Sequence, residues 1–198
     1  AEHMVCYVQR KEWGNVMRKA VLFIAMSLDG YIADKDGGVG WLLGQDAGAE
    51  NGNAYSEFVK GIDTVIMGWD TYHQVATELS PTEWVYREFT SYVVTHREGK
   101  PAENIHFTHE SPCSLVKRLK GQEGKGIWVC GGAKVVQQLM AEGLVDRFHI
   151  SIIPTILGGG IRLFGPMDAE VPLRLIRAES CNGITELVYE KRLPCLAN

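Results

Sequence analysis

The sequence of 198 residues lacks the features of two large protein classes. Its formal net charge is -4, whereas a general nucleic-acid-binding domain is usually basic because it faces phosphates. No apolar run approaches the roughly 20 residues that a membrane-spanning helix requires. We therefore expect neither a nucleic acid nor a membrane as a partner.

Disulfide frameworks and metal sites are also poorly supported. Histidines are scattered, with His106 and His109 as the only close pair, so no metal is expected. No signal peptide is visible, which makes the reducing cytoplasm the expected compartment. The cysteines are odd in number and no two have a C-x-x-C spacing: Cys6, Cys113, Cys130, Cys181 and Cys195.

The residues that are present suffice for one sizeable globular domain. Hydrophobic residues make up 45% of the chain, which permits a core and disfavours wholesale disorder. Residues 1–4 resemble a cloning remnant, and Met17 is a possible alternative start. We expect an N-terminal extension or tag remnant at 1–16, a domain at 17–193 and a tail at 194–198.

Short apolar runs alternate with segments of helical periodicity, as in α/β proteins. Strands are expected at 19–26, 63–68, 91–95, 104–107, 127–130 and 146–153. Helices are expected at about 53–62, after 69, after Ser111-Pro112 and from 133 to Gly143. The runs 171–181 and 184–192 meet at Asn182-Gly183, a strong hairpin signal. The sequence therefore predicts one α/β domain with a mixed sheet.

The stretch 127–140 is the most informative part of the chain. Four bulky apolar residues precede Gly131 and Gly132, as in a strand that is buried on both faces. The glycines allow a ligand to approach the backbone, and the following helix directs its free N–H groups there. This arrangement favours a phosphate-binding site. The helix is indicated by apolar residues at helical spacing: Val135, Val136, Leu139 and Met140.

A second strand–glycine–helix junction occurs at Gly68, with Asp70 or Thr71 as the expected helix cap. Two helix N-termini directed at one cleft would suit a diphosphate better than one. The alternative is purely structural, because any α/β protein contains such junctions.

Two strand exits offer polar groups to the same cleft. Asp29 follows the first strand beside Gly30, where it can face a ligand, although an Asx turn is the more frequent explanation. Thr95, His96 and Arg97 follow the strand at 91–95. These groups could contact a phosphate monoester, with a solvated strand end as the equally weighted alternative.

Three further segments could reach a substrate. The glycine-rich loop 36–42 contains Trp41 and could close over a ligand, or it is a plain surface turn. A triple glycine at 158–160 follows Thr155 and tolerates close backbone approach. Three acids lie on or near the helix at 53–62: Asp46, Glu50 and Glu57. That helix has an expected buried stripe: Tyr55, Phe58, Val59 and Ile62.

These motifs, taken together, resemble the dihydrofolate reductase superfamily. The resemblance is closer to the reductase (RibD C-terminal) domain of the bifunctional riboflavin-synthesis protein and its stand-alone bacterial relatives. It covers residues 18 to 192 in the same order throughout. The matching segments are 25–33 (AMSLDGYIA), 65–72 (VIMGWDTY), 129–133 (VCGGA), 144–146 (LVD) and 154–160 (PTILGGG).

The resemblance implies a three-layer α/β fold in which helices flank a mixed, mainly parallel sheet of about eight strands. It also implies an NADPH-dependent reductase of riboflavin biosynthesis that acts as a homodimer. Hydride would pass to a small heteroaromatic substrate, such as a ribosyl-pyrimidine or a pterin. Cofactor contacts would come from Ala25, Gly68, Trp69, Asp70, Thr71, Thr95, His96, Arg97, Gly131, Gly132, Ala133, Lys134 and Val135. Substrate contacts would come from Asp29, which is also the catalytic candidate, and from Trp41, Tyr55, Phe58 and Thr155.

Two positions depart from the family pattern. The family often has a basic residue where Trp69 stands, and tryptophan cannot replace a cation, although it could stack on adenine. True dihydrofolate reductases carry a carboxylate on the helix after the loop tryptophan. Asp46 follows Trp41 at the spacing of that carboxylate, but the length of the intervening loop does not allow the two acids to be aligned. A cofactor-binding protein with an unrelated substrate or no turnover is therefore the alternative, and an interaction protein with purely structural glycines is the third.

Overall fold

The computed structural model describes residues 17–50, 52–99 and 102–192. The expected N-terminal extension (1–16) and tail (194–198) lie outside the described residues. The helices are α1 (Ala54–Val59), α2 (Trp69–Gln74), the π-helical turn η1 (Val75–Leu79), α3 (Pro112–Lys120) and α4 (Ala133–Ala141). The first strands are β1 (Ala20–Ser27), β2 (Tyr31–Ala33), β3 (Ile62–Gly68), β4 (Thr90–Val94) and β5 (Ile105–Thr108). They are followed by β6 (Gly126–Gly131), β7 (Arg147–Ile153), β8 (Ile161–Arg162), β9 (Leu173–Cys181) and β10 (Ile184–Lys191).

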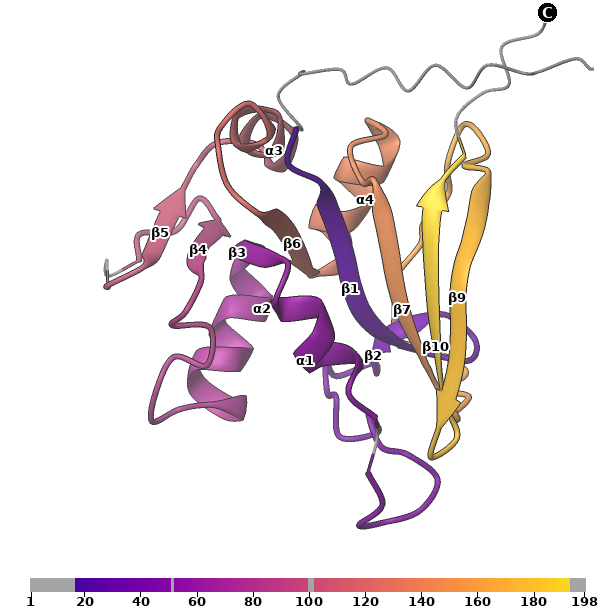
Figure 1. The fold of residues 1–198 in the computed structure, drawn as a ribbon. Coiled ribbons are helices and arrows are strands. Elements are labelled where there is room, and N and C mark those ends of the chain that lie inside the picture. Colours follow the sequence, from indigo (N-terminus) through magenta and orange to yellow (C-terminus); the bar gives the residue numbers. More distant parts are fainter. Residues whose placement is uncertain (1–16, 51, 100–101, 193–198) are drawn as a thin grey trace, which may run out of the picture.

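The main sheet has eight strands in the order β5-β4-β3-β6-β1-β7-β10-β9, which runs from left to right in Figure 1. The strands from β5 to β7 are parallel to one another. In contrast, β10 is antiparallel to both β7 and β9. The predicted turn is formed by Asn182 and Gly183, whose φ angles of 49° and 76° suit a two-residue hairpin loop. The expected mixed, mainly parallel sheet with a C-terminal hairpin is confirmed.

Helices cover both faces of this sheet and make three layers (Figure 1). The buried residues of α3 and α4 pack with those of β1, β6 and β7 on one face. On the other face, Phe58 of α1 packs with Trp128 of β6, and Trp69 and Tyr72 of α2 lie against the same cluster. The predicted start of α3 is confirmed, because the Ser111 Oγ accepts a hydrogen bond from the Ser114 N–H at 3.1 Å.

Several local predictions were wrong for identifiable reasons. The helix expected at 53–62 ends at Val59, because β3 begins only three residues later, and Tyr55 is 44% exposed instead of buried. Neither Asp70 nor Thr71 caps α2, since β3 runs directly into the helix and Gly68 is its N-cap. Asp46, which was expected on or near this helix, lies in the loop before it, which agrees with that expectation, and its N–H donates to the Asn182 Oδ1 at 2.9 Å.

His149 on β7 predicts a sensitivity of the fold to acid. Its ring lies 5.9 Å from Phe23 and 5.4 Å from Phe58. Burial, assisted by the charges of Arg147 and Arg177, lowers its pKa to about 4. Between pH 6.5 and 4 the unfolded chain binds a proton that the folded protein does not, so the free energy of unfolding falls across this window.

His149→Phe should flatten that decline by about 1–2 kcal/mol, a value discounted for partial solvent exposure. Urea unfolding at pH 7 and pH 4.5 measures the effect, and His106→Gln on the exposed side of β5 serves as the control. Equal declines in the wild type and in His149→Phe would contradict this assignment.

Candidate functional site

The candidate site lies where β3 and β6, which are neighbours in the sheet, lead into helices on opposite faces. At such a switch point the two connections diverge and leave a crevice at the carboxyl ends of the strands. Here β3 leads through Gly68 into α2, and β6 leads through Gly131 and Gly132 into α4. An ideal Cβ on Gly68 would lie 3.9 Å from the Gly132 backbone nitrogen. The predicted convergence of the two glycine turns is therefore confirmed.

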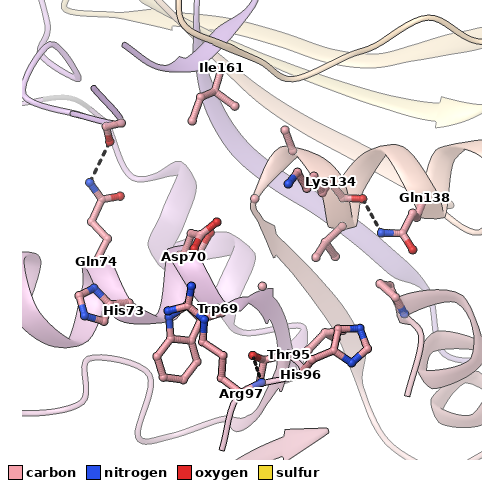
Figure 2. A pocket seen from close by; sticks show the side chains of 18 of the residues that line it. Trp69, Asp70, His73, Gln74, Thr95, His96, Arg97, Lys134, Gln138 and Ile161 are labelled. Atoms are coloured by element: carbon pink, nitrogen blue, oxygen red, sulfur yellow. Dashed lines mark hydrogen bonds between the residues drawn. The ribbon is translucent and has the colours of Figure 1, made fainter. Parts of the chain in front are cut away.

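A cavity of about 790 Å³ opens at this crevice (Figure 2). Its lining comes from the ends of β3 and β4, the starts of α2, α3 and α4, and the β2 segment. Ala25 and Gly131 are absent from the lining, although both were expected to contact a cofactor. The other expected residues are brought together there: Gly68, Trp69, Asp70, Thr71, Thr95, His96, Arg97, Gly132, Ala133, Lys134 and Val135.

The turn between β6 and α4 carries no side chain, because both of its residues, Gly131 and Gly132, are glycine. Gly131 has a φ of 137°, a conformation that residues with a side chain rarely adopt, and its peptide bond to Gly132 is cis. An ideal Cβ on Gly132 would lie 3.3 Å from the Thr71 Oγ1. The N-cap glycine of α4 has no side chain to bond the first-turn N–H groups. The bare backbone, the Thr71 hydroxyl and the helix dipole therefore suit an anion.

A cationic and aromatic group lies at one end of the cavity. The Arg97 guanidinium carbon is 5.2 Å from the centre of the Trp69 ring, so the two side chains stack (Figure 2). The Arg97 N–H donates to the Thr95 Oγ1 at 2.9 Å, which fixes the strand exit. The rings of His96 and His109 are 6.0 Å apart. This end can therefore accept both a flat ring and a phosphate.

Ile161 lies on the side of the cavity away from Arg97 (Figure 2), and Ile32, Ala33 and Gly37 also line the cavity. The Gln74 Nε2 donates to the Gly37 carbonyl at 3.0 Å, which ties the glycine-rich loop to α2. The cavity is thus bridged by a loop. Trp41, which was expected to contact the substrate, does not line this cavity. Its Nε1 donates to the Gly38 carbonyl at 3.2 Å within the glycine-rich loop.

Asp29 holds a loop beside the site. Its carboxylate accepts hydrogen bonds from the Ser27 Oγ at 2.6 Å and from the N–H groups of Leu157 and Gly158 at 3.1 and 2.8 Å. The Ser27 bond first, and then the two N–H bonds, lower the pKa of Asp29 to about 2. A carboxyl group with that pKa is ionised at neutral pH and has no proton to donate. These contacts favour an anchoring role for Asp29 over proton donation.

Asp29→Asn should release this loop from β1. Above pH 3.8 the ionised carboxylate contributes fully to stability, and the contribution is lost as the pH falls towards 2. At pH 7 we expect a lower Tm and faster hydrogen exchange at the Leu157 and Gly158 amides, measured by mass spectrometry. Asp36→Asn, on the exposed glycine-rich loop, is the control. Unchanged exchange at both amides would contradict the anchoring role.

The remaining expected substrate residues lie away from the cavity. Phe58 is 8% exposed and stacks on Phe23 with ring centroids 4.4 Å apart, so it is a core residue. Tyr55 packs edge-on against Trp128 at 5.9 Å. The Thr155 carbonyl accepts from the Leu28 N–H at 2.8 Å, which joins its loop to the end of β1.

A third strand-to-helix junction, before α3, was predicted from the sequence but was not expected to line the site. Ser111 and Pro112 at the start of α3 line the cavity, as do His109 and Glu110 after β5. The signal was available, because Ser111-Pro112 marks a helix start directly after a strand. Four further lining residues could not be found from a sequence motif: His73, Gln74, Glu78 and Gln138. Their place in the lining depends on how α2, η1 and α4 are oriented towards the cavity.

Three findings concern features other than the cavity. The part of the chain that the structure describes contains no cluster of three or more histidine, cysteine, aspartate or glutamate side chains that could hold a metal ion. Among the same residues, no helix combines the length and apolar character required to cross a membrane. Cys130, expected to be a small core residue, is half-buried and packs against the core cluster on the α1 face of the sheet.

The chain matches one protein family and two bacterial proteins. The family model described as the RibD C-terminal domain matches residues 18–189. The uncharacterized protein YwjB of Bacillus subtilis (strain 168) is 40% identical over 176 residues, which cover 87% of this chain and 97% of the relative. The uncharacterized protein YyaP of the same organism is 29% identical over 184 residues, covering 87% and 94%.

Solved structures share the fold. A putative riboflavin biosynthesis protein from Shewanella sp. PV-4 aligns with a TM-score of 0.76 and 24% identity, over 88% of this chain and 99% of that one. A diaminohydroxyphosphoribosylaminopyrimidine deaminase/5-amino-6-(5-phosphoribosylamino)uracil reductase from Thermotoga maritima aligns with a TM-score of 0.64 and 16% identity, over 89% of this chain and 57% of that one. Dihydrofolate reductase from Enterococcus faecalis, complexed with NADP(H), aligns with a TM-score of 0.58 and 13% identity, over 87% of this chain and 96% of that one. The expected dihydrofolate-reductase-like fold is confirmed.

Proposed function

The chain belongs to the RibD C-terminal domain family, and from this premise we propose that it is an NADPH-dependent reductase of a small heteroaromatic, ribosyl-pyrimidine or pterin-like substrate. The observation that carries the proposal is the convergence of Gly68 and Gly132 at one crevice. Relatives of this fold include a reductase and a protein complexed with NADP(H) by name.

The residues of the crevice fit such a cofactor. Because Gly132 has no Cβ, the position beside the Thr71 hydroxyl is open, and a diphosphate can approach the backbone there. The Trp69 ring offers a stacking surface for adenine, and Arg97 above it offers the cation that position 69 itself lacks. Arg97 thus supports a preference for NADPH over NADH.

NADPH would supply the hydride, and the protein would supply binding, orientation and exclusion of water. The first-turn N–H groups of α4 and the Thr71 hydroxyl would hold the diphosphate. Ile32 and Gly37 at the bridged end of the cavity would limit access of water to the reacting carbon. The acceptor ring would bind beside this end, close to the exit of β1.

Calorimetric titration with NADPH and with NADH tests the proposal. We expect saturable binding of NADPH, a rise in Tm with cofactor concentration and weaker binding of NADH. No heat and no shift in Tm at millimolar concentrations of either nucleotide would overturn it.

A second candidate is a cofactor-binding protein with an unrelated substrate or no turnover. It is favoured by the position of the single acid of α1. Glu57 forms an ion pair with Lys60 at 2.6 Å on the exposed side of the helix, so α1 offers no carboxylate to protonate a substrate. Cofactor binding without oxidation across pterins, pyrimidines, nitro compounds and quinones would select this candidate. The homodimer, the cytoplasmic location and a role in riboflavin biosynthesis stay predictions.

A further inference from the structure

A second cavity lies apart from the cofactor crevice, on the face of the sheet that carries α1 (Figure 1). Its volume of about 350 Å³ is within the range of small-molecule sites. Among the described residues, none lines both cavities. The crevice opens at the carboxyl ends of β3 and β4, whereas the second cavity contains Val21 near the start of β1 and Arg147 at the start of β7. The proposed cofactor therefore leaves this cavity unexplained.

The floor of the second cavity comes from two adjacent rows of the sheet. In the strand register His149 pairs with Val188, and Val188 pairs with Arg177, so these side chains form one row across β7, β10 and β9. Val21 and Arg147 pair in the next row. All five residues line the cavity. The two rows share a face of the sheet because side chains two apart on a strand point the same way.

The walls of this cavity are apolar and come from α1 and from a bulge in β9. Phe58 of α1 packs against the His149 ring with the ring centroids 5.4 Å apart. On the β9 side, the pairing with β10 shifts after Val188, which leaves Ile176 as an extra residue next to Arg177. Neighbouring residues on a regular strand point to opposite faces, whereas both of these line the cavity. The bulge therefore places an apolar side chain beside the guanidinium.

The Arg177 guanidinium is available to an anion. Its Nη1 lies 3.7 Å from the Glu179 Oε1, which is longer than a hydrogen bond, and its side chain is 40% exposed. Burial first, and then the charges of Arg147 and Arg177, lower the pKa of His149 to about 4. The positive potential of the two guanidiniums therefore extends to the floor of the cavity, where it favours a negative ligand group.

The other charged residues of the lining have partners. The Arg147 Nε donates to the Glu190 Oε1 at 3.1 Å. Glu57, at the α1 side, forms its ion pair with Lys60. The rest of the surface is mainly apolar, as in most small-molecule sites. A ligand matched to this cavity therefore combines an apolar body with a single negative charge.

We propose that this second cavity, the α1–β9 pocket, binds a small monocarboxylate that has an apolar chain or ring. The carboxylate pairs with Arg177 through charge-assisted hydrogen bonds. The apolar body lies between Phe58 and Ile176, over Val188, where it is removed from water. Because the pocket shares no described residue with the cofactor crevice, the carboxylate and the cofactor bind independently.

Calorimetric titration with octanoate, alone and in the presence of NADPH, tests the inference. The wild type should bind octanoate with a Kd of about 1 mM or tighter, and octanol at least about tenfold more weakly. NADPH should leave both affinities unchanged. Octanoate should also shift the NMR signals of the His149 ring, and it should leave the signals of His106, on the exposed side of β5, unchanged.

Arg177→Gln should weaken octanoate binding by at least about tenfold and leave octanol binding unchanged, because it removes the charge alone. Ile176→Ser should weaken both probes by about three- to tenfold, because it removes apolar contact. The matched control is Arg174→Gln. It removes a positive charge from the same strand, its side chain is 67% exposed, and it lies outside the lining. It should keep wild-type affinities, and all three variants should keep the wild-type Tm to within a few degrees.

Three outcomes would overturn the inference. The first is a folded Arg177→Gln protein that binds octanoate as the wild type does, or a wild type that binds no octanoate at millimolar concentrations. The second is competition between octanoate and NADPH, which would place the anion in the crevice. The third is octanoate binding that disappears at protein concentrations where sedimentation shows a dimer, which would assign the pocket to a second copy of the chain.

Discussion

Gly132→Val is expected to reduce binding of both NADPH and NADH by roughly 100-fold or more. The position is extended, with a φ of -78°, so a side chain is compatible with the backbone. An added Cβ would already lie 3.3 Å from the Thr71 Oγ1, and the valine methyl groups would extend into the cavity. A phosphate excluded from the turn loses several charge-assisted hydrogen bonds of about 1.5–3 kcal/mol each.

The matched control for this variant is Gly121→Ala at the C-cap of α3. The added Cβ there would lie 3.5 Å from the Arg118 carbonyl, an ordinary contact, and Gly121 is outside the cavity lining. Calorimetry should give wild-type affinities for this control, and circular dichroism should show that both variants are folded. A folded Gly132→Val protein with wild-type affinity for NADPH would exclude the glycine turn as the diphosphate site.

Arg97→Gln is expected to weaken NADPH binding by about 10- to 100-fold and to leave NADH binding nearly unchanged. The two nucleotides differ by the 2′-phosphate, and the guanidinium over the Trp69 ring is the group placed to bind it. The difference between the affinities for NADPH and NADH should also shrink as the ionic strength rises, because the contact is exposed to screening.

Arg87→Gln controls for the loss of a positive charge. Arg87 has a side chain that is 70% exposed, is paired with Glu83 and is not part of the cavity lining. Its removal should leave both affinities unchanged. If Arg97→Gln weakened NADPH and NADH equally, Arg97 would act on a part shared by both cofactors, and the proposed basis for preferring NADPH would be wrong.

The sheet and the two glycine junctions could be predicted because they depend on local pattern. Apolar runs before Gly68 and Gly131 mark strands, and helical spacing after them marks α2 and α4, so the amino-acid sequence alone indicates both turns. Ser111-Pro112 and Asn182-Gly183 likewise act through their own backbone and side chains. The three-layer arrangement followed from the resemblance.

Features that depend on distant contacts could not be predicted. Asp29 was expected to meet a substrate, but its partners Leu157 and Gly158 are far away in sequence and become visible only when the loop folds back on β1. The hydrogen bond between Ser151 and Glu186 likewise carries no local signal, because it requires the β7–β10 register. The end of α1 at Val59 was missed because a strand that follows closely overrides helical periodicity.

Most of these inferences depend on a dinucleotide whose diphosphate lies between Gly68 and Gly132. A crystal structure of the protein grown with NADPH tests that placement directly. We expect continuous density that places the diphosphate at the start of α4 beside the Thr71 hydroxyl, with the adenosine end at Trp69 and Arg97. Density for the cofactor elsewhere on the protein, or a crevice filled by side chains with the cofactor excluded, would contradict it.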